Sequence, residues 1–241
     1  MALPKIDVPT YEIELPVSKK KIRYRPFLVK EQRNLLMAME SSDSSSVHSA
    51  IRDILYNCTL TEGIDIDSLP IIDVEYYFIN LRAKSVGEIV ESKYRCNNIV
   101  NDKECNNLME HNLDLTSVEV EMSDDIQPEI QLTENLSVKM KFPEFGLVKD
   151  SVKLESETEI TFNMLAQSIE YIYDGEQFYY GHETPVEELV QFIENMSQEQ
   201  FEKIEKFFNS LPKLKTQIKM KCSKCGFDHT ISVEGLESFF G

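Results

Sequence analysis

Two pairs of cysteines, far apart in the sequence, constrain the fold most strongly. The first pair is Cys222 and Cys225, in Cys-Ser-Lys-Cys-Gly, which has the spacing of a zinc knuckle. In such a turn two thiolates and nearby backbone amides point at one ion, and the glycine that follows, Gly226, relieves the turn sterically. Because one knuckle supplies only two of the four ligands that a structural zinc needs, two more must come from elsewhere in the chain.

Cys96 and Cys105 are the best remaining pair. Their spacing is C-x8-C, which predicts a knuckle with a long insertion, and strand-like segments flank it as they flank the knuckle at Cys222. The sequence therefore predicts one structural zinc ion that is bound by Cys96, Cys105, Cys222 and Cys225. Such an ion would join the two ends of an inserted region, and its binding energy would become folding energy.

Other interpretations of the cysteines remain open. Both pairs could be free thiols, and His229, four residues after Cys225, could replace one ligand. A redox role for the C-x-x-C pair is weaker, because such a motif precedes a helix and this one lies between strands. Cys58 ends an apolar helical stretch, so we expect a buried small hydrophobe. An odd number of cysteines, five, argues against a disulfide framework.

Periodicity along the chain predicts an α+β fold. Polar and apolar residues alternate in a hairpin over 11–28, and apolar residues recur at helical spacing in 30–86 and 158–211. The order is hairpin, helices, strands, helices and strands. We expect three regions: an N-terminal hairpin and helical region (1–87), a split zinc-ribbon-like β unit (88–117 and 215–241), and an inserted β then helical region (118–214).

Several local signals refine this expectation. Asp73 is predicted to cap the third helix, whose apolar face is Val74, Tyr77, Phe78 and Leu81. Capping boxes are predicted at Thr184–Glu187 and Ser197–Gln200, and a polar loop at 41–46. The segment Tyr171–Tyr180 places five aromatic residues around an Asp-Gly turn. It is either a partner-binding surface or a core-packed connection between helices.

The charge of the chain limits its partners. The net charge is −17, with 42 acidic and 25 basic residues, which disfavours nucleic acid because phosphate binding needs a basic face. An acidic protein is better suited to basic protein surfaces. No apolar run approaches the ~18 residues that span a bilayer, and the N-terminus lacks the apolar core of a secretory signal. We therefore expect a location in the cytoplasm of the cell that makes the protein.

Sequence motifs for catalysis are absent. The chain has no G-x-S-x-G, no H-E-x-x-H and no glycine-rich phosphate loop. A zinc ion with four cysteine ligands leaves no open position for a substrate. We therefore predict that the protein is not an enzyme.

Several stretches of the chain together resemble the T4-type bacteriophage baseplate family. The most specific are the block Arg25–Glu31 (RPFLVKE) and the block that begins at Leu69-Pro-Ile-Ile-Asp73 and continues into Leu81–Glu88 (LRAKSVGE). Residues 51–58 and the terminal stretch 235–240 are similar to the same family. The resemblance covers nearly the whole chain.

The resemblance implies a role in the baseplate hub, the central part of the baseplate beneath the tail tube. Members of the family are described as hub subunits or hub assembly catalysts, and no enzymatic activity or catalytic residue comes with the resemblance. It implies other hub proteins as partners, assembly in the host cytoplasm and a place in the tail baseplate. The zinc site follows from the cysteines of this chain instead. A zinc-ribbon module associated with nucleic acid or transcription remains the alternative function.

Overall fold

The computed structural model describes residues 6–41, 44–123, 126–147 and 156–234. The terminal stretch 235–240, part of the family resemblance, lies outside these residues. The described helices are α1 (Val29–Glu40), α2 (Ser44–Cys58), α3 (Ile71–Ser85), η1 (a 3-10 turn, Leu115–Ser117), α5 (Glu157–Gln167), α6 (Val186–Glu194) and α7 (Gln198–Asn209). The described strands are β1 (Tyr11–Glu14), β2 (Lys21–Tyr24), β3 (Ile89–Arg95), β4 (Ile99–Val100), β5 (Lys103–Glu104), β6 (Leu108–Asp114), β7 (Glu119–Glu121), β8 (Glu129–Gln131), β9 (Ser137–Met140), β10 (Ile169–Tyr173), β11 (Phe178–Tyr180), β12 (Lys213–Lys221) and β13 (Asp228–Glu234). The fold is α+β, as predicted, and none of the described helices has the length and apolar character of a transmembrane span.

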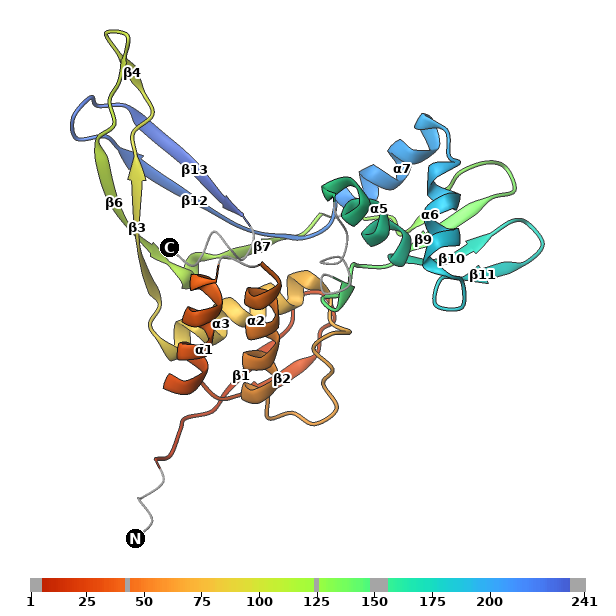
Figure 1. Ribbon diagram of the computed structural model, residues 1–241, viewed down its shortest axis with the longest axis horizontal. Coiled ribbons are helices and arrows are strands. Elements are labelled where there is room, and N and C mark those ends of the chain that lie inside the picture. The colour runs from red at the N-terminus through yellow and green to blue at the C-terminus, as the bar shows by residue number, and fades with distance from the viewer. Residues whose placement is uncertain (1–5, 42–43, 124–125, 148–155, 235–241) are drawn as a thin grey trace.

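The N-terminal part packs three helices against a hairpin (Figure 1). Strands β1 and β2 pair antiparallel, and helices α1, α2 and α3 contribute to one hydrophobic cluster with them. The predicted apolar face of α3 is fully buried in this cluster, which confirms the helical periodicity of the sequence: its residues are Val74, Tyr77, Phe78 and Leu81.

Asp73 does not cap helix α3, so that prediction was wrong. The N-cap residue is Pro70, and Asp73 is the third residue of the helix. Its buried carboxylate instead accepts hydrogen bonds from the backbone N–H groups of Val17 and Ser18, both at 2.8 Å. These two residues lie in the turn between β1 and β2. The carboxylate near the positive end of the helix thus fixes the hairpin turn.

The capping box at Thr184–Glu187 was also wrong. Helix α6 begins at Val186, with Pro185 at its N-cap and no side-chain cap. The hydroxyl of Thr184 donates to the carbonyl oxygen of Tyr180 at 2.9 Å, so it closes the turn that precedes the helix. The fixed φ of Pro185 provides the helix start instead.

The second predicted capping box is confirmed at helix α7. The Ser197 hydroxyl accepts from the backbone N–H of Gln200 at 3.3 Å, and the Ser197 N–H donates to the Gln200 side chain at 2.8 Å. The polar loop predicted for 41–46 is shorter than expected, because helix α2 already begins at Ser44. Residues 42 and 43 lie outside the described residues.

A second hydrophobic cluster lies between residues 126 and 211, in the β8–α7 part of the chain. Its sheet has the strand order β11-β10-β9-β8, all antiparallel, and helices α5, α6 and α7 contribute to the cluster on one face. The sequence placed 169–180 in a helical region with an Asp-Gly turn inside it; the turn is confirmed, but the residues on either side form β10 and β11. Asp174 and Gly175 make the turn between the two strands: the Asp174 carboxylate accepts two backbone N–H groups, and Gly175 has φ +95°.

Two hairpins form an arm that projects from the N-terminal part (Figure 1). One is β3–β6, and the other is β12–β13, to which β7 adds a third strand. At the base of the arm, Leu113 and Ile218 share a hydrophobic cluster with Ile79 of helix α3. Among the described residues no backbone pairing joins β3–β6 to β12–β13. Side chains must therefore join the two hairpins further out.

Candidate metal centre

The sulfur atoms of four cysteines meet in the outer part of the arm. Cys96 and Cys105 come from the end of the β3–β6 hairpin, and Cys222 and Cys225 from the turn between β12 and β13. The Sγ atoms of Cys96 and Cys225 are 3.6 Å apart, and those of Cys105 and Cys222 are 3.8 Å apart. All four sulfurs lie within 4.8 Å of one another. The structure thus brings together the four cysteines that the sequence singled out, in a cluster that could hold a metal ion.

The spacing of the sulfurs matches tetrahedral coordination. A metal–sulfur bond of ~2.3 Å in a tetrahedral site separates neighbouring sulfurs by ~3.8 Å. A disulfide would need ~2.0 Å, so these are free thiols. Cys96, Cys105 and Cys222 are buried and Cys225 is half-buried. The donor set is soft and closed to bulk solvent on most sides, which suits a thiolate-bound structural ion.

Backbone hydrogen bonds shape the knuckle at Cys222. Its N–H donates to the carbonyl oxygen of Phe227 at 2.9 Å, and the N–H of Gly226 donates back to the Cys222 carbonyl oxygen at 2.9 Å. Gly226 has φ +75°, in the left-handed region that a glycine adopts without a Cβ clash. The sequence signal C-x-x-C-G is therefore explained by the turn itself.

The knuckle at Cys96 repeats this pattern in spite of its long spacing. The N–H of Cys96 donates to the carbonyl oxygen of Asn107 at 2.9 Å, and the N–H of Asn106 donates to the Cys96 carbonyl oxygen at 3.0 Å. Asn106 follows Cys105 as Gly226 follows Cys225, and it also has a positive φ, +51°. Asparagine is among the few residues that tolerate this conformation. The two cysteine pairs therefore form two equivalent turns.

The extra residues between Cys96 and Cys105 form a small hairpin of their own. Strands β4 and β5 pair antiparallel, and Asn101 and Asp102 form the two-residue turn between them with φ +51° and +61°. Positive φ at both positions is the signature of a tight hairpin turn. The residues between Cys96 and Cys105 thus extend from the knuckle as a compact hairpin, and both sulfurs stay in the cluster.

Two asparagine side chains contact the cluster, and the sequence analysis missed them. Asn98 donates its amide N–H to Cys225 Sγ at 3.6 Å, and Asn107 donates to Cys222 Sγ at 3.5 Å. Each amide therefore reaches from one knuckle to a sulfur of the other. A signal existed, since Cys-Asn-Asn occurs at both 96–98 and 105–107.

His229 also lies against the cluster. Its Nε2 atom is 3.2 Å from the Sγ of Cys96, and the ring is buried. The imidazole is close enough to hydrogen-bond to this sulfur. The four cysteine sulfurs already provide four donors without it, so the geometry gives His229 a contact beside the cluster, not a place as a required ligand.

The thiols differ in how readily they ionise. Backbone N–H groups, chiefly those of Cys225 and Lys224, lower the pKa of Cys222 to about 6. The N–H of Phe227 likewise lowers the pKa of Cys225. Burial raises the pKa of Cys96 to about 12. Since the thiolate is the ligating form, negative charge is already favoured at the Cys222 knuckle.

Cys58 lies apart from the cluster. It is fully buried in the N-terminal core, where burial raises its pKa to about 11. A thiol in such surroundings is unreactive and contributes by packing. This confirms the prediction of a buried small hydrophobe.

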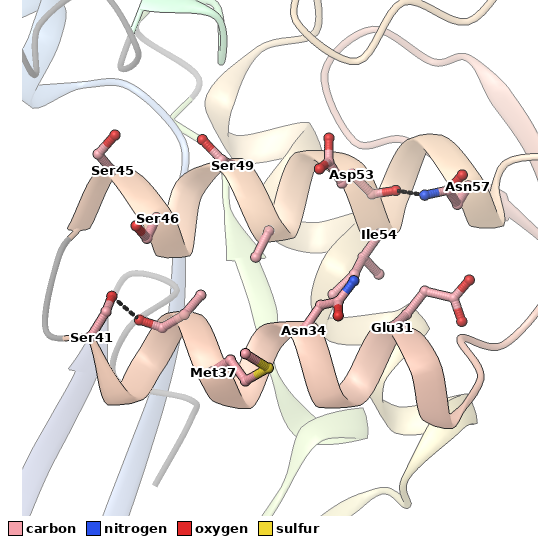
Figure 2. Close-up of a pocket in the computed structure, with 12 residues that line it drawn as sticks. Glu31, Asn34, Met37, Ser41, Ser45, Ser46, Ser49, Asp53, Ile54 and Asn57 are labelled. Atoms are coloured by element: carbon pink, nitrogen blue, oxygen red, sulfur yellow. Dashed lines mark hydrogen bonds between the residues drawn. The ribbon is translucent and has the colours of Figure 1, made fainter.

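A shallow groove lies between helices α1 and α2 (Figure 2). Its lining is mostly small and polar and includes neither histidine nor cysteine. Within it the Asn57 side chain donates to the Asp53 carbonyl oxygen and the Ser41 hydroxyl to the Ala38 carbonyl oxygen, each inside its own helix. These bonds hold the Asn57 and Ser41 side chains along their own helices.

Comparison with known proteins identifies the family. A family model described as T4 bacteriophage base plate protein matches residues 8–241, nearly the whole chain. Searches of curated proteins and of solved structures returned no match. The family model covers the N-terminal part, the arm and the β8–α7 part together, and on this ground the chain belongs to the T4 bacteriophage base plate protein family.

Proposed function

We propose that this protein is a non-enzymatic structural or assembly protein of the baseplate hub, acting through protein–protein contacts. The match of the family model over residues 8–241 carries this proposal. The shape supports it, because a projecting arm and a separate inserted part expose a large surface for partners (Figure 1). The partners would be other hub proteins, met in the host cytoplasm during assembly and retained in the tail baseplate if the protein stays in the virion.

The charge supports basic partners. At −17, the chain repels its own copies and attracts basic surfaces, which raises the rate of encounter with them. Binding that depends on such attraction weakens with salt. A hub partner that bound equally well at low and high salt would contradict this part of the proposal.

A structural zinc ion bound by Cys96, Cys105, Cys222 and Cys225 forms the second part of the proposal. The sulfur spacing, the paired knuckles and the closed set of four thiols support it. The ion would join the two hairpins of the arm, whose described residues share no backbone pairing. It would supply folding energy and no chemistry.

Strand pairing supports a split unit with an insertion. The chain leaves the arm through β7 and returns through β12, and these strands pair antiparallel, with Val120 opposite Leu214. Residues 118–214 would then be an insertion into a unit made of 88–117 and 215–241, beside the N-terminal region 1–87. The hydrophobic cluster formed within the insertion supports this division.

Co-expression with the other hub proteins tests the proposal. We expect a stable complex on purification, with about one zinc per chain by elemental analysis. Mass spectrometry of purified virions would separate a permanent component from an assembly factor that leaves. If the protein purified alone from cells that express all the baseplate proteins, the proposed role would be contradicted.

One observation favours the alternative, a nucleic-acid-associated zinc module. Lysines alternate along one side of β12, at Lys213, Lys215, Lys219 and Lys221. However, Lys215 is paired with Glu121, 3.1 Å away, and the chain as a whole is acidic. We expect no retention of duplex DNA or RNA in a filter-binding assay at moderate salt, and strong retention would favour the alternative.

A further inference from the structure

An aromatic surface covers the outer face of the inserted sheet, near the turn between β10 and β11. Cross-strand register places Tyr171 opposite Tyr180 and Tyr173 opposite Phe178. Ile172, between the two tyrosines of β10, points into the core beneath helices α5, α6 and α7. Because side chains alternate along a strand, the four aromatic rings lie on the opposite face. We call these four residues the aromatic face.

The rings of the aromatic face touch one another and reach solvent. The centroids of Tyr173 and Phe178 are 4.6 Å apart in a stacked arrangement, and Tyr171 meets Phe178 edge-on at 5.1 Å. Phe178 is 51% exposed and Tyr180 43% exposed. Strand β11 is also the last strand of its sheet. Single exposed aromatics are ordinary, whereas a contiguous group of them marks an interaction surface.

A cation already lies on this face. A register shift between Ile169 and Tyr171 leaves Glu170 exposed beside Tyr171. The ammonium group of Lys139 lies 5.6 Å from the Tyr171 ring centroid and 3.2 Å from the Glu170 carboxylate. One ring of the face thus binds a positive charge that a neighbouring carboxylate holds in place.

The surroundings of the face are acidic. Strands β8 to β11 and the turn between β10 and β11 contain four carboxylates, Glu129, Glu170, Asp174 and Glu176, and one lysine, Lys139. A purely apolar partner would have to cover these charges without pairing them, which is costly. Phosphates would be repelled. Arginine fits best, because its planar guanidinium stacks on a ring and pairs with a carboxylate at once.

We propose that the aromatic face docks a basic protein surface whose arginine side chains stack on Phe178 and Tyr180 and pair with the surrounding carboxylates. This inference rests on the proposed assembly role and names the chemistry of one partner surface. Aromatic side chains and arginine are the residues most often responsible for interface affinity.

Two peptides of equal charge test the proposal with the purified full-length chain. Fluorescence anisotropy would measure binding of labelled nona-arginine and nona-lysine at about 0.15 M salt. Stacking favours arginine, so we expect the wild type to bind nona-arginine about fivefold more tightly. The double variant F178T/Y180T, with residues that strands tolerate, should lose this preference. The matched control is Tyr56→Gln, which removes a more accessible ring (71% exposed) from helix α2 and should keep the preference.

A second variant keeps the test decisive if F178T/Y180T fails to fold by circular dichroism. E129Q/E170Q retains all four rings and should weaken both peptides while the preference for arginine remains. Equal binding of the two peptides by the wild type would overturn the proposal, as would a preference that survives in a folded F178T/Y180T. Because these measurements use no hub protein, they can fail while co-expression still yields a hub complex, and the reverse also holds.

Discussion

Asn98 and Asn107 link the two cysteine knuckles at the residue scale. Each donates an amide N–H to a sulfur of the opposite knuckle, which orients that sulfur and offsets its negative charge. We predict that the double variant N98A/N107A binds zinc about tenfold more weakly, as measured by competition with a chromophoric chelator. Asn97→Ala is the matched control, since Asn97 is exposed in the same Cys-Asn-Asn repeat. If N98A/N107A and Asn97→Ala bound zinc with equal affinity, the amides of Asn98 and Asn107 would not support metal binding.

Asp73 is a buried carboxylate that satisfies two backbone groups in a distant turn. Asp73→Ala should destabilise the protein by about 2–4 kcal/mol, because the partly buried N–H groups of Val17 and Ser18 would lose their acceptors. Asp73→Asn retains one acceptor oxygen, so its loss of stability in urea denaturation should be intermediate. If the two variants unfolded at the same urea concentration, the turn would not depend on these bonds.

Sequence spacing predicts those site residues whose geometry is local. Cys222 and Cys225 lie in one turn, so their motif carries the arrangement of both sulfurs. The amide of Asn107 reaches a sulfur 115 residues away, and Asp73 reaches a turn 55 residues away. Such contacts depend on how elements pack: the Cys-Asn-Asn repeat draws attention to Asn107, but no local pattern specifies which distant group its amide reaches.

Glu31 at the start of helix α1 makes the stability of this element depend on pH. Burial raises its pKa, but hydrogen bonds from the Arg25 side chain and the Leu28 N–H, together with the nearby positive charges, outweigh burial and hold the pKa below its usual value of 4.5. A group with a lowered folded pKa contributes stability above its unfolded pKa and loses it as pH falls through the folded one. Glu31 should therefore stabilise helix α1 at neutral pH and cease to do so in acid.

The variant Glu31→Gln should have a free energy of unfolding about 1–3 kcal/mol lower than the wild type at pH 7, because a charge-assisted interaction is removed. The difference in the free energy of unfolding between wild type and variant should shrink as pH is lowered below the usual pKa of 4.5. Urea denaturation at a series of pH values measures it. Glu40→Gln is the control, in the same helix but exposed. A gap that stays constant down to strongly acidic pH would contradict the linkage.

Elements with a long apolar period were predictable, and short aromatic ones were not. Helix α3 buries Val74, Tyr77 and Leu81 along one face, which the sequence shows directly. In α1 Leu35 is buried but the adjacent Leu36 is 52% exposed, so an apolar residue of a helix need not lie on its buried face. Strands β10 and β11 are only five and three residues long and lie between helices, so periodicity could not separate them from helix.

At the scale of the whole molecule, the sulfur cluster and the arm explain each other. A two-stranded hairpin alone is marginally stable in water, and the described parts of β3–β6 and β12–β13 share no backbone pairing. Among the described residues, hydrophobic contacts join the two hairpins near α3 and around the sulfurs, and Tyr94 and Met220 belong to both clusters. An ion bound at the cysteines would therefore decide whether the outer arm is one rigid body or two loose hairpins.

Removal of the metal should loosen the arm while the N-terminal core stays folded. Hydrogen exchange of the zinc-loaded chain, before and after treatment with a strong chelator, should show lost protection in β3, β6, β12 and β13 and unchanged protection in α3. Cys225→Ser should reproduce this pattern without chelator, because three thiolates bind zinc more weakly than four. Cys58 is buried in the N-terminal core, outside the sulfur cluster. Cys58→Ala should therefore lower the hydrogen-exchange protection of α2 and α3 while the arm stays protected. If neither the chelator nor Cys225→Ser changed hydrogen exchange in the arm, packing alone would hold the two hairpins together.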